Sequence, residues 1–285
     1  MGPDRLDPRL WHVSHCARTI AGMIHVTFLG SGSAGNSTLV TWGGTSVLID
    51  CGFSAREITR RLASHGEDAG RVKAVFVTHE HSDHARGLRV FAERTGAAVF
   101  ASEGTARAAH AEGRGPFEHE RVSAGRPITL GDLEILPFAV SHDAQEPLGF
   151  VISAPDGTRL GYASDLGCLT RESAEALADC DLLALEANHD PDMLAHGPYP
   201  TFLKRRIASR VGHLSNVAAA DALESMATRR LRHVFAVHVS RTNNTGTLAV
   251  DSMRERLRRL GIDAGVTAVG QDTGVRFPDR QAALF

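Results

Sequence analysis

The sequence has no excess of charge of one sign and no long apolar run, and both absences narrow its class. With 31 Lys and Arg against 33 Asp and Glu, the formal net charge is −2, so no global basic field indicates a nucleic-acid partner. A polyanion would have to be held by a local basic patch or by metal. No uninterrupted apolar run approaches the roughly 20 residues of a membrane-spanning helix, so we expect no membrane partner.

Cysteine is also scarce. The four cysteines form no CxxC pair, a pattern typical of reduced, mostly buried thiols in a cytoplasmic protein; they are Cys16, Cys51, Cys168 and Cys180. Residues 1–22 contain several charges but lack the apolar segment of a secretory signal. We therefore predict a loose N-terminal extension over residues 1–22 and a single folded domain over residues 23–285, because no linker or low-complexity tract divides the rest.

Alternating apolar residues and turn residues predict a chain rich in both strands and helices. The predicted strands cover residues 23–29, 38–42, 46–50, 73–77, 98–100, 128–130, 133–140, 148–153, 159–163, 181–186 and 232–237. The predicted helices cover residues 54–65, 85–95, 102–111, 171–177, 199–210, 216–229 and 247–260. The order forms two halves, each rich in strands and each closing with helices. Helices outside two stacked sheets are one of the few stable arrangements for such an order.

Histidine is unusually frequent, with 15 copies, and several copies follow predicted strands. Four predicted strands lead directly to residues that bind metals: His79, His81, Asp83 and His84 after one, and His142, Asp165 and His238 after the other three. Loops at strand ends are common ligand sites because the scaffold beneath them is rigid. Imidazole and carboxylate groups suit Zn, Mn or Fe, and an aspartate can bridge two ions. A lone strand-end histidine is more often a surface or capped residue, an alternative that the crowded first group fits badly.

The segment HEHSDH at residues 79–84 matches the HxHxDH signature of the metallo-β-lactamase fold. Further segments occur along residues 23–260 in the order FLGSGSAGNST, IDCG, SHDAQEPLGF, ASDLG, LEANHD, GPYP, LKRRI, GHLSN and HVSRTNNT. HxHxDH alone specifies only the superfamily, whereas the combination of LEANHD, GHLSN and HVSRTNNT is much more specific. Together these segments resemble the YycJ-type (WalJ-type) members, which are 5′→3′ DNA exonucleases.

This resemblance implies an α/β fold, the metallo-β-lactamase αββα four-layer sandwich, with the site at one edge between the two sheets. It also implies two divalent metal ions, Zn²⁺ or Mn²⁺, one held by His79, His81 and His142 and the other by Asp83, His84 and His238, with Asp165 bridging. The extra residues before Met23 and the tail after Leu260 depart from the family, and we expect neither to bear on the site. DNA is the expected partner, and no protein partner is evident.

The chemistry expected of such a site is phosphodiester hydrolysis. Two metals about 3.5–4 Å apart can share a hydroxide that attacks phosphorus in line with the leaving oxygen. His213 is the candidate general acid for the leaving 3′ oxygen, by resemblance to transfer-RNA-processing and cyclic-phosphodiesterase members. Glu186 is the candidate carboxylate that orients His213, and Asp83 is counted with these catalytic groups as well as with the ligands. A locally hydrogen-bonded His213 and a salt-bridged Glu186 are the alternatives.

Polar and basic residues near the motifs are the predicted substrate contacts. Asp50, at the end of a strand, is expected to hold a ligand histidine by its free N–H; an ordinary turn aspartate is the alternative. The candidate phosphate contacts are Asn36, Ser37, Ser240 and Asn243 on loops, and Lys204, Arg205 and Arg206 near Tyr199. Glycine-rich loops often serve only to turn the chain, and a solvated helix face is the alternative for the basic run.

Three functions are compatible with these residues. The favoured one is a 5′→3′ DNA exonuclease that uses a metal-bridging hydroxide as nucleophile and His213 as general acid. The second is a small-molecule hydrolase of the same fold, such as a cyclic phosphodiesterase, thioesterase or lactonase, and thioester chemistry does not require an acid at His213. The third is a non-catalytic binding module, against which the complete ligand set argues.

Overall fold

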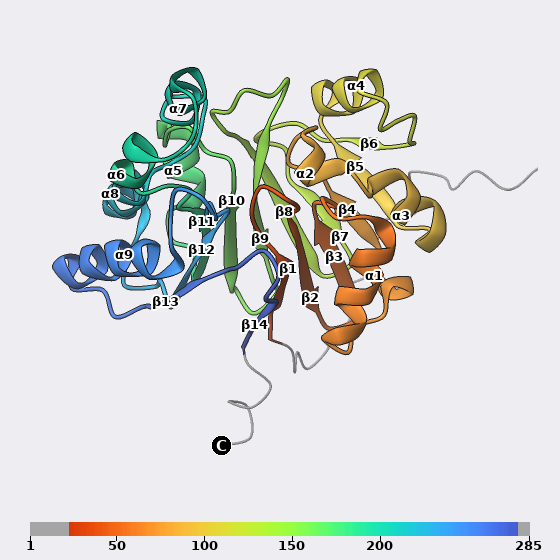
Figure 1. The fold of residues 1–285 in the computed structure, drawn as a ribbon. Helices are drawn as coiled ribbons and strands as arrows, with labels where there is room; N and C mark the ends of the chain where they lie inside the picture. Colours follow the sequence, from red (N-terminus) through yellow and green to blue (C-terminus); the bar gives the residue numbers. More distant parts are fainter. Residues whose placement is uncertain (1–22, 279–285) are drawn as a thin grey trace, which may run out of the picture.

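Two sheets form the centre of the molecule. In the computed structural model, which describes residues 23–278, each sheet has seven strands (Figure 1). The first has the order β14-β1-β2-β3-β4-β5-β6, with β1 (His25–Gly30), β2 (Ser37–Trp42), β3 (Thr45–Ile49), β4 (Ala74–Phe76), β5 (Ala98–Ala101), β6 (Glu120–Arg121) and β14 (Val275–Phe277). The second has the order β13-β12-β11-β10-β9-β8-β7, with β7 (Ile128–Leu130), β8 (Leu133–Ala139), β9 (Leu148–Ser153), β10 (Arg159–Ala163), β11 (Leu182–Glu186), β12 (His233–Val237) and β13 (Gly265–Ala268).

Helices cover the outer face of each sheet, which gives the predicted αββα sandwich (Figure 1). The first sheet is covered by α1 (Ala55–Ser64), the short η1 (Ala69–Arg71), α2 (Ser82–Ala85), α3 (Leu88–Thr95) and α4 (Glu103–Ala111). The second is covered by α5 (Arg171–Leu177), α6 (Pro191–His196), α7 (Thr201–Ile207), α8 (Asn216–Met226) and α9 (Gly246–Leu260). No helix within residues 23–278 is long and apolar enough to cross a membrane.

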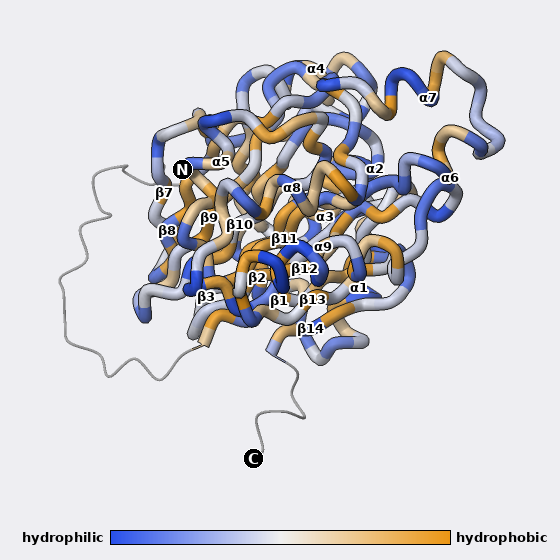
Figure 2. Tube along the Cα trace, turned by 90° about the vertical axis from the view of Figure 1, so that its left-hand side faces the viewer, coloured by the Kyte–Doolittle hydropathy of each residue, from blue (hydrophilic) through white to orange (hydrophobic). Residues whose placement is uncertain are grey.

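Apolar side chains from both sheets pack into one central cluster. Phe28 of the first sheet meets Phe235 of the second with ring centroids 4.8 Å apart, and Phe76 meets Phe150 at 5.6 Å. One further apolar cluster lies between each sheet and the helices that cover it. Figure 2 shows hydrophobic residues concentrated along the strands and hydrophilic ones along the outer loops. Burial on both faces makes the sheets a rigid support for the loops at their ends.

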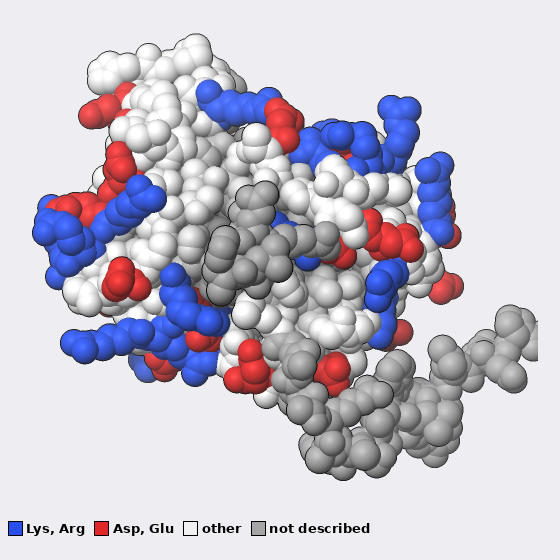
Figure 3. Space-filling model, turned by 90° about the horizontal axis from the view of Figure 1, so that it is seen from below, with Lys and Arg blue, Asp and Glu red and all other residues white. Residues whose placement is uncertain are grey.

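Strand direction brings several loops to one edge of the sandwich. Strands β10, β11, β12 and β13 run parallel to one another, and β8 runs the same way because β9 is antiparallel to both β8 and β10. In the first sheet, β3, β4 and β5 are parallel. The carboxyl ends of parallel strands meet at one edge, where ligand sites form. On the face seen from below, basic and acidic residues are interspersed (Figure 3), in agreement with the near-zero net charge.

Most predicted elements form within a residue or two of the predicted bounds, and Ser54, Ser102 and Ser215 cap their helices as expected. The helix predicted over residues 85–95 is wrong in its extent, because it is divided into α2 and α3. Gly87 separates them, and its amide donates to the Cys51 carbonyl at 2.8 Å. A Cβ at this position would lie 2.1 Å from the Phe53 carbonyl oxygen, so the close backbone approach requires glycine.

Five elements escaped prediction: the three-residue η1, the two-residue β6, α6, β13 and β14. Helix α6 has only six residues. Its N-cap is Asp190, whose side chain accepts from two backbone amides, and its first residue is Pro191. Strands β13 and β14 have four and three residues, too few for an alternating pattern to stand out. The N-terminal extension predicted over residues 1–22 lies outside the described residues, and the single domain over residues 23–285 stays a prediction.

Candidate metal centre

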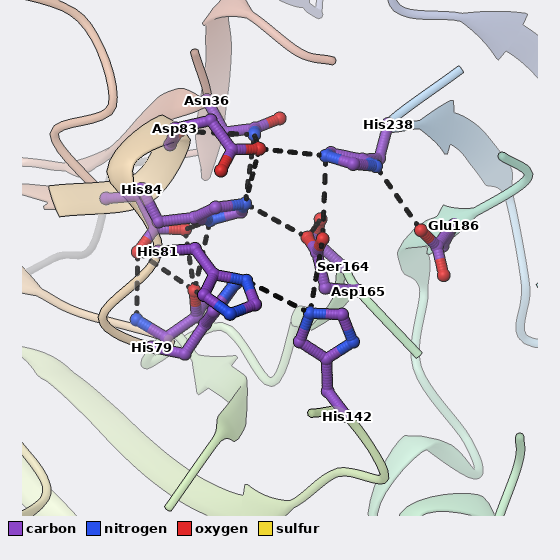
Figure 4. Close-up of polar contacts among 12 residues, drawn as sticks. Asn36, His79, His81, Asp83, His84, His142, Ser164, Asp165, Glu186 and His238 are labelled. Atoms are coloured by element: carbon purple, nitrogen blue, oxygen red, sulfur yellow. Dashed lines mark hydrogen bonds and ion pairs between the residues drawn. The ribbon is translucent and has the colours of Figure 1, made fainter. Parts of the chain in front are cut away.

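Seven side chains converge at the shared edge of the sheets (Figure 4). His79 and His81 follow β4, Asp83 and His84 lie in α2, and single residues follow three strands of the second sheet: His142 after β8, Asp165 after β10 and His238 after β12. The backbone of Asp165 and of His238 is left-handed, with φ of 55° and 54°. Such strained residues are uncommon and gather at functional sites.

The seven residues form two adjoining groups in which the nitrogen and oxygen atoms lie within 4.8 Å of one another. One group contains His79, His81 and His142, and the other contains Asp83, His84, Asp165 and His238. Asp165 lies between the groups, with Oδ2 at 3.0 Å from His84 Nε2 and Oδ1 at 3.9 Å from His142 Nε2. The structure therefore brings the predicted ligand residues together, and Asp165 has one oxygen on each side.

The donor set and its unpaired atoms fit divalent metal ions. His79 Nε2 is buried and has no hydrogen-bond partner within residues 23–278, although its Nδ1 lies 3.0 Å from the Thr78 hydroxyl. A buried polar atom without a partner is destabilising, and a metal ion would satisfy it. Burial holds the pKa of His79 well below its usual range despite the nearby Asp165 carboxylate, and the neutral imidazole that results is the metal-binding form.

Partners behind the centre orient the histidine rings. His84 Nδ1 donates to Asp50 Oδ2 at 2.7 Å, and Asp50 in turn accepts from the Thr78 amide at 2.8 Å. His142 Nδ1 lies 3.0 Å from the Gly212 carbonyl oxygen. When Nδ1–H is engaged in this way, Nε2 presents its lone pair to the centre. Asp50 thus lies against His84, a predicted ligand histidine.

Glu186 and His213 form a second pair beside the centre. Glu186, fully buried at the end of β11, accepts from His213 Nδ1 at 2.7 Å and from the amides of Leu166 and Leu214. Burial opposes ionisation of Glu186, but the charge of His213 and its hydrogen bond outweigh burial and lower the pKa of Glu186 to about 2. The same carboxylate outweighs burial at His213 and raises the pKa of that imidazole above its ordinary value.

The glycine-rich loop between β1 and β2 places Asn36 and Ser37 behind the centre. Both side chains are buried; Asn36 Oδ1 accepts from the Gly32 amide at 2.8 Å, and its Nδ2 lies 3.0 Å from His84 Nε2. Ser37 Oγ donates to the Asp50 carbonyl at 2.8 Å. These two side chains therefore contact the residues of the centre and its supports.

The C-terminal segment bears on the site, contrary to the expectation that the tail after Leu260 does not. The Gln271 carboxamide accepts from the Ala34 amide at 2.8 Å and donates to the Gly35 carbonyl at 2.6 Å. It thus holds the loop that positions Asn36. Strand β14 then pairs with β1, which brings this segment beside the start of the described chain.

An open pocket of about 430 Å³ lies over the centre. Among the predicted residues, His81, Asp83, Asp165, His238 and His213 line it, together with Ser240, Tyr199 and Arg206. The rest of its lining comprises Ser33, Ser82, Glu112, Arg114, Asn188, Leu203 and Ile207.

Besides Asn36 and Ser37, three more predicted substrate contacts lie apart from the pocket lining: Lys204, Arg205 and Asn243. Lys204 Nζ donates to the Ala195 carbonyl at 2.8 Å, Arg205 is exposed, and Asn243 is buried with Oδ1 unpaired within residues 23–278. Arg206 on the same helix faces the pocket, and its Nε donates to Asp143 at 2.6 Å.

Asn188 and Arg114 are among the residues of the site that sequence reasoning missed. Asn188, in the LEANHD segment, lies with Nδ2 3.1 Å from His238 Nδ1 and donates to the His238 carbonyl at 3.0 Å. Its position in the loop after β11 carried no metal-ligand signal, because an asparagine is ordinary in a loop. Arg114 follows α4 in a segment predicted only as a polar loop, and nothing in that segment's pattern indicates which side chains face the pocket.

The chain is similar in sequence and in fold to known proteins. A family model described as the beta-lactamase superfamily domain matches residues 45–238. A protein named exodeoxyribonuclease YycJ from Bacillus anthracis is 35% identical over 260 residues, which cover 90% of this chain and 98% of that protein. Exodeoxyribonuclease WalJ from Streptococcus pneumoniae is 33% identical over 262 residues, 90% of this chain and 96% of that protein. The metallo-beta-lactamase fold protein YhfI from Bacillus subtilis superimposes with a TM-score of 0.67 at 14% identity, over 89% of this chain and 99% of that one.

Proposed function

Because the chain belongs to the beta-lactamase superfamily, and within it to the family of YycJ and WalJ, we propose that it is a metal-dependent exonuclease that degrades DNA from the 5′ end. The similarity to proteins named exodeoxyribonucleases spans both halves of the chain and supports DNA as the substrate. The observation that carries the phosphodiester chemistry is the Glu186–His213 hydrogen bond of 2.7 Å beside the predicted ligands. DNA as the substrate and phosphodiester hydrolysis as the chemistry together define the proposed reaction.

The proposed metal ligands are His79, His81 and His142 for one ion, and Asp83, His84 and His238 for the other, with Asp165 shared. Zn²⁺ and Mn²⁺ both suit this imidazole and carboxylate set. When bound, two such ions would supply Lewis-acid activation of the phosphate and a hydroxide nucleophile at neutral pH. The buried, unpaired Nε2 of His79 supports this proposal.

His213 is the proposed proton donor to the leaving 3′ oxygen. Glu186 engages Nδ1, so the second ring nitrogen, Nε2, holds the proton that the leaving group requires. The raised pKa of His213 favours its protonated form near neutral pH. Glu186 itself is fully buried and acts as a positioning residue, because its carboxylate contacts His213 at 2.7 Å and His238 Nδ1 at 3.3 Å and does not line the pocket.

The proposed DNA contacts differ in how directly they act. Arg206 and Ser240 line the pocket and are proposed to contact phosphate oxygens, while Tyr199 offers an aromatic face for a base. Lys204 and Arg205 lie on the same helix as Arg206 and extend its positive charge outward. We propose that buried Asn36, Ser37 and Asn243 act by shaping the loops that hold these groups.

The test compares wild type with His213→Ala on two phosphodiesters. Loss of a general acid lowers the rate by about 10²–10⁴-fold, and we expect this loss on single-stranded DNA with Zn²⁺ or Mn²⁺. Bis-p-nitrophenyl phosphate releases p-nitrophenolate, a leaving group that needs no proton, so His213→Ala should lose much less activity on it. Equal losses of activity on both substrates would show that His213 is not the general acid.

A small-molecule hydrolase is the second candidate, since a pocket of about 430 Å³ falls within the range of sites for small ligands. The purified wild-type protein is therefore also offered a glutathione thioester. Thioester hydrolysis without DNA degradation would overturn the nuclease proposal. Release of mononucleotides from the labelled 5′ end of DNA, with the thioester intact, is the expected result, and release from the 3′ end would contradict the proposed polarity.

A further inference from the structure

We propose that Arg114 binds a second phosphate group of the substrate, one other than the phosphate being hydrolysed, and so selects a polynucleotide over a simple phosphodiester. This inference rests on the proposed nuclease function and deepens it. Arg114 and Arg206 are the two Lys or Arg side chains that line the pocket over the centre, as far as residues 23–278 show.

The two arginines come from opposite halves of the sandwich. Arg114 lies three residues after α4, which covers the first sheet, and Arg206 lies on α7, which belongs to the second. Figure 1 shows α4 and α7 at opposite sides of the upper end of the molecule. The predicted ligands and His213 line the pocket between these two walls. A strand that enters over the centre would therefore meet a guanidinium on either side of the scissile phosphate.

Arg114 is held in place by its backbone and lines the pocket over the centre. Its backbone amide donates to the Ala109 carbonyl at 2.9 Å, which ties the loop to the end of α4. The side chain is 18% exposed, and its Nε is buried without an acceptor within residues 23–278. Arg206 differs, because its Nε is already engaged by Asp143. Because Nε is buried, a phosphate in the pocket would meet the terminal N–H groups of the Arg114 guanidinium, which form a fixed fork suited to phosphate oxygens.

Three acidic residues lie near the Arg114 guanidinium, and one of them would compete with a substrate phosphate for it. Glu112 forms an ion pair with the Arg114 guanidinium and is half exposed, so water weakens this pair. Glu80 and Asp83 attract the guanidinium from the side of the centre, and Glu80 Oε2 is buried without a partner within residues 23–278. An arriving phosphate would replace the Glu112 carboxylate on the guanidinium.

The experiment measures binding as well as turnover. Arg114→Gln is compared with Arg107→Gln, a matched change at an exposed residue of α4 outside the pocket lining. Affinity for fluorescent single-stranded DNA is measured on metal-free protein across a salt series. We expect Arg114→Gln to weaken binding about 10–100-fold, as for one charged hydrogen-bonded contact, and to reduce the slope of log K against log salt by about 0.7.

With metal restored, the ratio of kcat/KM on DNA to kcat/KM on bis-p-nitrophenyl phosphate separates a second phosphate from the scissile one. The diester has a single phosphate, so we expect this ratio to fall about tenfold or more in Arg114→Gln and to stay at the wild-type value in Arg107→Gln. Oligonucleotides with a 5′ phosphate and with a 5′ hydroxyl identify the phosphate: a loss confined to the former assigns the terminal group, and an equal loss assigns an internal one. Either pattern supports the inference, and an unchanged ratio overturns it.

Glu112→Gln provides a test of opposite sign. Removing the competing carboxylate should tighten DNA binding, whereas Arg114→Gln weakens it. If the ion pair served only to stabilise the loop, both variants would change binding in the same direction, and the inference would be wrong. Wild-type protein that neither binds nor degrades DNA would overturn the nuclease proposal and this inference together, while normal DNA degradation by Arg114→Gln would overturn the inference alone.

Discussion

Asp50→Asn tests the support of the metal centre with little disturbance to the backbone. Asp50 has a left-handed φ of 64°, a conformation that asparagine tolerates about as well as aspartate. The side chains have the same shape, so the fully buried site neither gains nor loses volume. The change is therefore chemical: a carboxylate that accepts from His84 Nδ1 at 2.7 Å becomes an amide.

The consequence follows from the hydrogen bonds. One amide oxygen can still accept from Thr78 N, as Asp50 Oδ1 does at 2.8 Å, which turns the NH₂ group toward His84. His84 must then accept at Nδ1 and move its proton to Nε2, which faces Asp165 Oδ2 at 3.0 Å. That proton occupies the position from which His84 would bind metal. Loss of such a supporting partner lowers metal affinity or activity about 10–100-fold.

The assay is competition between the protein and a chromophoric chelator for Zn²⁺ and for Mn²⁺. We expect the affinity of Asp50→Asn to fall by about 10–100-fold, and thermal unfolding of the metal-free protein to show that the fold persists. Asp156→Asn is the matched control, because Asp156 makes the same kind of bond to a backbone amide in the turn between β9 and β10. Equal metal affinity of the two variants would refute the assigned role of Asp50.

Two further predictions concern stability. Gly52→Ala places a Cβ 1.7 Å from the Asp83 carbonyl oxygen, so we expect a loss of about 1–3 kcal/mol or more in urea unfolding, whereas Gly44→Ala, with open space around it, should change stability little; equal effects would contradict the close approach. Hydrogen bonding by Arg60 is the largest cause that lowers the pKa of Glu57 to about 2, below its unfolded value of about 4.3. This carboxylate therefore stabilises the fold above about pH 4.3 and loses that contribution as the pH falls through 2, so Glu57→Gln should be less stable than wild type at pH 7, with the gap closing toward pH 2; a gap independent of pH would refute the assignment.

The predicted ligands could be located from the sequence because each carries a local signal. His79 to His84 form a dense motif after a buried strand, and His142, Asp165 and His238 each follow a strand whose direction sends them to the same edge. Strand ends are recognisable from alternation and turns alone. The convergence then follows from the topology, which the layered arrangement of sheets and helices restricts to few choices.

The supports of the site could not be predicted in the same way, because they join residues far apart in the chain. Gln271 contacts Ala34 and Gly35 across more than 230 positions, and glutamine in a loop has no pattern that indicates a partner. The break at Gly87 depends on the approach of Phe53, a tertiary contact that outweighs the helical spacing. Arg114 faces the pocket only because of the path of its loop.

The pairing of β14 with β1 has a consequence for the protein during its synthesis. Val26 lies opposite Phe277, so β1 can pair with β14 only after the described residues between them have been made. His238 is the last of the predicted ligands along the chain, and Gln271, which supports the loop of Asn36, comes after it. A chain truncated before these residues would therefore lack His238 or the support that Gln271 gives to the loop of Asn36, and its centre would be incomplete.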